Sequence, residues 1–199
     1  MPESDQLCLL GEPLRPERRG NAVAGQAAVA LGWSGAVAAG MRLFGHDVAV
    51  VAEVDQQAHE QRLGTGWGPV TDRMSVALWE WPEHRATVPP SAVALRGVIA
   101  QGQRWQRVLA SAVGFIGFCS TAIVLEHAHD PGQHCLLTAH LYGVSVVRLG
   151  PPEGGPSLVQ EGRDGPVETA RPSTLTRWVE ELVYSRLLED HMIRTSTAG

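Results

Sequence analysis

Apolar residues recur at helical spacing in three stretches of the chain, and we predict helices at residues 21–44, 91–112 and 174–190. Each stretch begins with a side chain that caps helices well, and these caps are Asn21, Ser91 and Ser173. Residues 55–63 predict only a weak helical turn. The polar side chains of the last helix, which we expect to face water, are Arg177, Glu181 and Glu189.

Between these helices, apolar residues alternate with polar ones or form short runs rich in valine, and both patterns predict strands. The predicted strands are residues 46–54, 73–81, 115–127, 134–149 and 157–161. Pro131-Gly132 lies between the third and the fourth, and proline followed by glycine suits a type II turn. We therefore expect these two strands to pair as an antiparallel hairpin.

The succession of helix, two strands, helix, three strands and helix predicts an α+β fold. We expect one domain over residues 21–190, a largely antiparallel sheet of about five strands with helices packed on it. Residues 1–20 contain three prolines and are expected to form an N-terminal arm, and residues 191–199 a flexible tail. In element order, residues 22–190 resemble roadblock and GAF-like modules, and this resemblance implies helices on one or both faces of the sheet.

All 16 basic side chains are arginines, and the chain has no lysine. Schiff-base chemistry and phosphate binding by a P-loop or kinase-type lysine are therefore excluded. The net charge of −5, without any basic run, gives no electrostatic attraction for nucleic acid. The three cysteines show no paired spacing, which argues against a disulfide scaffold or a structural zinc ribbon and favours the cytoplasm.

Residues 18–41 have an alternative interpretation as an export signal. Arg18-Arg19 precede an uncharged stretch that ends in small residues, which is the layout of a twin-arginine signal. The stretch is rich in alanine and glycine, and four acidic residues precede it, so we favour a structural role. The same weak apolarity argues against a membrane span.

Half of the eight histidines lie within fourteen residues around Pro131-Gly132, and they are His127, His129, His134 and His140. With a two-residue loop, the hairpin register places all four on one face, where three imidazoles can hold zinc. With a three-residue loop, His127 joins the apolar face. We favour the second register because it groups the aliphatic side chains of both strands, and we therefore predict no metal site.

In the favoured register, His127 and Glu126 are candidates for an acid/base pair beside a cavity between the sheet and its helices. His129 or Cys135 is the auxiliary catalytic candidate. The candidate substrate-binding residues, which would line the pocket, are Trp79, Trp81, His140 and Tyr142. The alternative interpretation is that His127 is a core histidine, that the other histidines are solvated and that the tryptophans belong to the core.

Arg96, Arg104 and Arg107 lie largely outside the apolar stripe of the predicted helix at residues 91–112. They could grip an anionic ligand or partner, or they could form an ordinary solvated helix face. We favour the solvated face.

These patterns favour a protein that binds an apolar small molecule, with the candidate activity of a cofactor-independent acid/base enzyme of the isomerase, dehydratase or cyclase type. An alternative is a non-catalytic regulatory or protein-interaction module of the roadblock or GAF-like kind. Its first and last helices would then serve an interface in a homodimer or with another partner. A third alternative is a zinc-dependent hydrolase that uses the hairpin histidines.

Overall fold

The computed structural model describes residues 16–126, 131–150, 155–171 and 173–193 of the chain. Within them, six strands form one sheet whose order in space follows their order in sequence. The strands are β1 (Ala36–Leu43), β2 (His46–Val54), β3 (Val93–Gly102), β4 (Ser120–Leu125), β5 (Ser145–Leu149) and β6 (Pro156–Gln160). β1, β2 and β3 pair antiparallel, β3, β4 and β5 pair parallel, and β6 is antiparallel to β5. The sheet is therefore mixed, with one strand more than expected.

Six α-helices and two 3₁₀ helices occupy the described residues. They are α1 (Pro16–Ala30), α2 (Gln56–Gly64), α3 (Arg73–Ala77), η1 (Leu78–Glu80), η2 (Pro82–Thr87), α4 (Trp105–Val113), α5 (Gly132–Tyr142) and α6 (Thr174–Glu189). Parallel strands require a crossover connection, and α4 and α5 provide the two crossovers between β3, β4 and β5.

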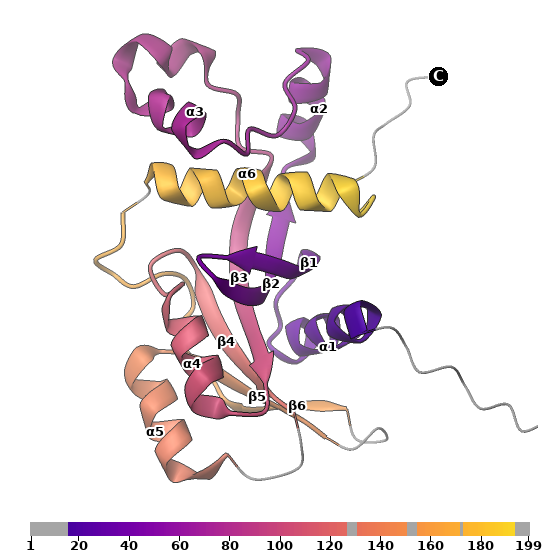
Figure 1. The fold of residues 1–199 in the computed structure, drawn as a ribbon, viewed down its shortest axis with the longest axis vertical. Helices are drawn as coiled ribbons and strands as arrows, with labels where there is room; N and C mark the ends of the chain where they lie inside the picture. The colour runs from indigo at the N-terminus through magenta and orange to yellow at the C-terminus, as the bar shows by residue number, and fades with distance from the viewer. Residues whose placement is uncertain (1–15, 127–130, 151–154, 172, 194–199) are drawn as a thin grey trace, which may run out of the picture.

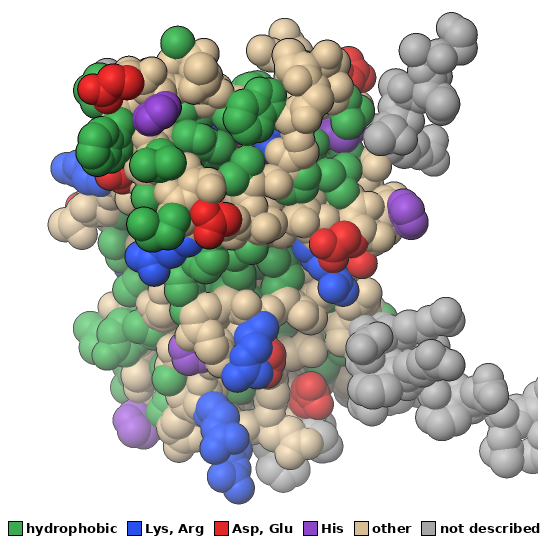
Figure 2. Space-filling model, turned by 45° about the horizontal axis from the view of Figure 1, so that its top comes forward, with side chains coloured by type: hydrophobic (Ala, Val, Ile, Leu, Met, Phe, Trp, Pro, Cys, Tyr) green, Lys and Arg blue, Asp and Glu red, His purple; other side chains and the backbone are tan. Residues whose placement is uncertain are grey.

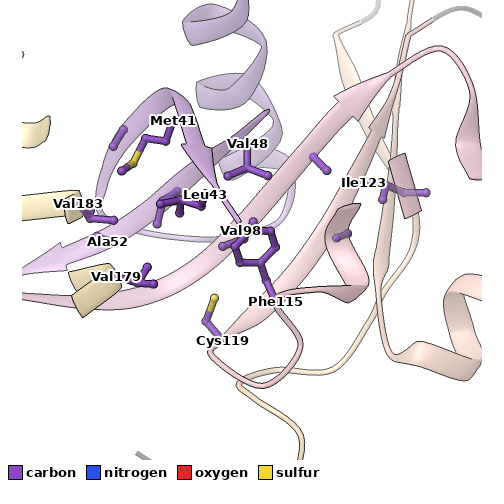
Figure 3. Close-up of a cluster of buried hydrophobic side chains, with 14 of the residues drawn as sticks. Met41, Leu43, Val48, Ala52, Val98, Phe115, Cys119, Ile123, Val179 and Val183 are labelled. Carbon is purple, nitrogen blue, oxygen red and sulfur yellow. The ribbon is translucent and has the colours of Figure 1, made fainter. Parts of the chain in front are cut away.

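Helices cover both faces of the sheet, which explains why β2 and β4 are almost continuous apolar runs. On one face, α4, α5 and α6 complete the larger core, to which Val108 and Val183 belong. On the other face, α1 packs through three buried alanines, Ala24, Ala27 and Ala28. Figure 1 shows α6 crossing the upper strands and α4 and α5 beside the lower ones, and Figure 3 shows side chains of the larger core.

A separate group of short helices lies beyond α6, at the top of Figure 1. We call residues 68–90, which contain α3, η1 and η2, the upper lobe. The lobe leaves the body after α2 and returns to it just before β3.

The α+β class is confirmed, and several predicted elements are present. The strands expected at residues 46–54 and 157–161 are β2 and β6, and the weak helical turn is α2. Ser173 caps α6 as expected, since its hydroxyl accepts a hydrogen bond from the Thr176 N–H at 3.3 Å. None of the helices in the described residues has the length and hydropathy that a membrane span needs.

The predicted helix at residues 21–44 is wrong in its second half. α1 ends at Ala30, Gly32 turns the chain with a φ of 67°, and residues 36–43 form β1. β1 is buried on both faces, because Ala38 joins the larger core and Ala39 the smaller one. A strand with apolar residues on both faces also satisfies a helical spacing, so the pattern did not distinguish the two.

Two further predictions are wrong, one because an expected strand is helical and one because part of an expected helix is a strand. Residues 73–80 are helical, and the Asp72 carboxylate caps α3 by accepting a hydrogen bond from the Ser75 N–H at 2.7 Å. The expected helix at residues 91–112 is β3 followed by α4, which begins only at Trp105. β3 lies between β2 and β4 in the middle of the sheet, so its apolar residues show no alternation.

The hairpin predicted around Pro131-Gly132 is wrong. Residues 132–142 are α5, and the strands on either side of it, β4 and β5, are parallel. α5 buries Cys135 and Ala139 but exposes two leucines, so its apolar residues surround the helix and obscure the helical period. The expected element order is also lost, and the resemblance to roadblock and GAF-like modules, which rested on that order, no longer applies.

β3 passes so close to Trp33 at Gly97 that a Cβ atom there would overlap the indole ring. We expect Gly97→Ala to lower the free energy of unfolding by about 1–3 kcal/mol, because an overpacked core must shift to accept the methyl group. Urea unfolding measures this loss. In a Trp33→Leu background the same substitution should cost less, and an unchanged cost would show that the indole is not the obstacle.

Candidate functional site

A cleft of about 570 Å³ opens at the carboxyl end of β3, where the chain turns into α4. One wall is α4, which contributes Arg104, Arg107 and Ser111. Gly45 of the β1–β2 turn and His46 at the start of β2 form the opposite wall, and the last residues of β3 line the cleft as well. In sheets with parallel strands, ligands commonly bind outside the carboxyl ends of those strands.

The β1–β2 turn is a two-residue hairpin loop of Phe44 and Gly45. Both residues have a positive φ, 51° for Phe44 and 83° for Gly45, as a type I′ turn requires. Phenylalanine adopts this conformation at a cost. The centre of the Phe44 ring lies 5.7 Å from the ring centres of Phe115 and Phe118, two residues of the segment that joins α4 to β4. These contacts fix the turn beside α4.

α4 approaches the end of β3 closely because residue 102 is a glycine. A Cβ atom on Gly102 would lie 3.0 Å from Cγ2 of Val108, which α4 buries beneath it. Gly102 is also paired with Leu125 of β4, so the start of the crossover is held between sheet and helix. The sequence thus sets the first turn of α4 directly above the edge of the sheet.

The cleft is lined by two arginines and one carboxylate, and neither arginine forms an ion pair with it. Arg104 and Arg107 are exposed, lie about one helical turn apart, and form no ion pair with any described residue. Asp47, the one acidic lining residue, lies 3.5 Å from Arg42. An anion in the cleft would therefore meet two guanidinium groups.

Glu126 of the expected acid/base pair lies one strand away from the cleft. Its backbone N–H donates a hydrogen bond to the Gly102 carbonyl at 3.2 Å, and its side chain is half-buried. His127 and His129 lie outside the described residues. The structure therefore places one member of the expected pair at the carboxyl edge of the sheet.

The remaining candidates from the expected hairpin lie on α5 and do not meet. Cys135 is buried, and burial raises the pKa of its thiol, which describes a core cysteine and not a nucleophile. His140 and Tyr142 are exposed. His134 is exposed too, and its ring lies edge-on to Trp105 at 5.3 Å.

The two tryptophans expected to line a pocket belong to the upper lobe and not to a strand. Trp79 is half-buried, with the Arg177 guanidinium 5.2 Å from the centre of its ring, whereas Trp81 is exposed. Arg96 lies on β3, where it donates a hydrogen bond to the Asp164 carboxylate at 2.8 Å. Among the described residues, no three histidine, cysteine, aspartate or glutamate side chains are grouped to hold a metal ion.

Sequence reasoning missed a buried ion cluster between α2 and α6. Arg62 and Glu181 are 0% and 1% exposed, and two hydrogen bonds of 2.7 and 2.8 Å join the guanidinium to the carboxylate. Arg177 adds a second cation at 2.9 Å from Glu181. Glu181 had been expected to face water, because its position on α6 is polar in sequence. The upper lobe covers it, and helical spacing alone does not show that cover.

The ion cluster ties both ends of the upper lobe to the body. Arg62 donates to the carbonyls of Gly68, at 2.6 Å, and of Pro90, at 3.3 Å. Glu181 accepts from the Val70 N–H at 2.9 Å, and Arg177 donates to the Pro89 carbonyl at 2.7 Å. Arg62 and Glu181 are closed to solvent, so we assign the cluster a structural role.

Tyr184 on α6 and His59 on α2 extend the cluster. The Tyr184 ring lies 4.7 Å from the Arg62 guanidinium, and its hydroxyl is 2.8 Å from Nδ1 of His59. Burial raises the pKa of the Tyr184 hydroxyl, so this group stays protonated at neutral pH.

Comparison with known protein families, with curated proteins and with solved structures gives no significant match.

We expect Glu181→Gln to lower the free energy of unfolding by about 3–5 kcal/mol, because it leaves Arg62 as an uncompensated buried charge. Urea unfolding followed by circular dichroism measures this loss. Glu189→Gln on the exposed surface of the same helix is the control and should change it by less than about 0.5 kcal/mol. Equal effects of Glu181→Gln and the control would contradict the structural role.

Proposed function

We propose that the protein binds a small organic anion, one that carries a phosphate or carboxylate group, in the cleft between α4 and the β1–β2 turn. The observation that carries this proposal is the pair Arg104 and Arg107, which line the cleft without a carboxylate partner among the described residues. Guanidinium groups bind both anions through paired, charge-assisted hydrogen bonds.

Three further features of the cleft favour such a ligand. His46 lies across from the arginines and can donate a hydrogen bond to the same anion. Arg104 is the N-cap residue of α4, and helix N-termini attract negative charge. The volume of about 570 Å³ falls within the range of small-molecule sites, so a bare phosphate would leave room for an organic body.

The charged side chains of the lining favour an anionic ligand over the apolar one expected from the sequence. Seven of its twelve residues are polar or charged. The acid/base enzyme and the zinc hydrolase both depend on histidines of a hairpin, and that hairpin does not form. We therefore propose binding as the function, without a catalytic step.

The other expected properties stay proposals. A cytoplasmic location is supported by the free thiols of Cys119 and Cys135, the two cysteines within the described residues. A role as a protein-interaction module is favoured by the exposed apolar side chains of the upper lobe.

Isothermal titration calorimetry of the full chain with inorganic phosphate and with citrate tests the proposed function. We expect saturable binding of at least one of them, and a loss of about tenfold or more in affinity when Arg104→Gln and Arg107→Gln are combined, because two charge-assisted contacts are removed. Rising salt should weaken binding.

The matched control is Arg171→Gln. Arg171 is exposed and outside the cleft lining, and its guanidinium donates only to the nearby carbonyls of Glu168 and Ala170. Its loss should leave the affinity unchanged. The proposal fails if neither anion binds, or if the control weakens binding as much as the cleft variant.

A further inference from the structure

The outer surface of the upper lobe carries an apolar ridge. We use this name for Met74, Leu78 and Trp81, whose side chains are 71%, 49% and 60% exposed. Met74 lies on α3, Leu78 on η1 and Trp81 directly after η1, at a spacing of four and three residues. Val76 and Trp79 turn inward instead, so the lobe has apolar residues on both sides. Figure 2 shows hydrophobic side chains gathered on this part of the surface.

The ridge is held on a fixed support. The ion cluster of Arg62, Glu181 and Arg177 binds the backbone at both ends of the lobe, and the Trp178 indole N–H donates to the Thr71 carbonyl at 2.7 Å. Little conformational entropy is therefore lost when a partner covers the ridge. Exposed apolar patches of this kind mark interaction surfaces.

A hollow of about 300 Å³ lies directly beside the ridge, and we call it the α6 hollow. Arg73, Ala77 and Glu80 form its wall on the lobe, and residues 173–175 at the start of α6 form the other wall. Each of the three lobe residues immediately precedes a ridge residue in sequence, so ridge and hollow share one short helical segment.

We propose that the upper lobe is the interface of a homodimer, in which the ridge of each copy packs into the α6 hollow of the other about a twofold axis. A twofold interface brings the same patch of both subunits together, so a patch that carries a projection and an adjacent hollow can match itself.

Charge complementarity favours a second copy of this chain as the occupant. Arg73 lies at the start of the segment and Glu80 near its end, and neither forms an ion pair with a described residue. In antiparallel packing about the twofold axis, Arg73 of one copy faces Glu80 of the other, and this pair occurs twice. Asp72, beside Arg73, is directed to its own helix, because it accepts hydrogen bonds from the Ser75 N–H and hydroxyl.

Sedimentation velocity of the full chain at micromolar concentration tests this interface. We expect a dimer, and a shift to monomer when Leu78→Ser and Trp81→Ser are combined. The control combines Leu137→Ser and Leu141→Ser on α5, whose side chains are exposed to a similar degree, and it should remain dimeric. Circular dichroism and thermal unfolding confirm that each variant is folded.

Exchanging the charges of Arg73 and Glu80 tests whether these two residues pair across the interface, and it leaves the apolar ridge unchanged. Arg73→Glu and Glu80→Arg should each weaken the dimer about tenfold or more, and the two together should restore it, because the exchanged charges again face each other.

Several results would overturn the proposal. They are a wild-type chain that stays monomeric at hundreds of micromolar, a dimer that survives the ridge variant or dissociates in the α5 control, and a charge exchange that does not restore association. Binding of the monomer to anionic phospholipid vesicles through the ridge would assign the surface to a membrane instead. None of these results bears on anion binding by the cleft, which lies on other elements.

Discussion

Parallel pairing of β3 with β4 is the constraint on which the architecture of the site depends. Two parallel neighbours cannot be joined by a tight turn, so the chain must leave the end of β3, cross the sheet as α4 and return. The antiparallel partner on the other side of β3 is β2, whose first residue comes from the β1–β2 turn. The carboxyl end of β3 therefore lies between a helix start and a hairpin turn, and the cleft is the space between them.

The buried ion cluster stabilises a different part of the molecule. A fully buried arginine and glutamate are costly to desolvate, and their attraction offsets this cost only when their hydrogen bonds are well satisfied. Here the bonds reach both ends of the upper lobe, so the cluster fixes 23 residues that otherwise contribute little to the sheet core. A hydrophobic pair could stabilise the body equally well but could not bind those backbone groups.

The sequence predicted the elements whose signals are local, and failed where burial on both faces removed the periodicity. α6 has a capping serine after a proline and one apolar stripe, and β2 is a short valine-rich run, so both were found. β1 and β3 are apolar on both faces, so their residues fit a helical spacing and the pattern predicted helices there. α5 was taken for a strand although Gly143, with a φ of 68°, ends it in the left-handed conformation typical of a helix terminus. This glycine was the available signal against the hairpin.

The candidate site was predicted only in part, for the same reason. Anion binding by Arg104 and Arg107 was the less favoured of two interpretations, because a place outside an apolar stripe is equally typical of a solvated helix face. Their position above the carboxyl end of β3 follows from the parallel pairing of β3 with β4, which no local sequence pattern predicts. The ion pair of Arg62 and Glu181 joins residues more than a hundred positions apart, and only the folded chain brings them together.

The central claim is that the turn after β1 and the start of α4 act as two walls of one anion site. The most direct measurement is a two-dimensional ¹H–¹⁵N NMR titration of the full chain with inorganic phosphate and with citrate. At least one of these anions should shift the amide signals of residues 45–47 and 102–107 together, along one saturation curve, while those of residues 73–81 stay in place. Shifts confined to one wall, shifts centred elsewhere, or no saturable shift with either anion would contradict it.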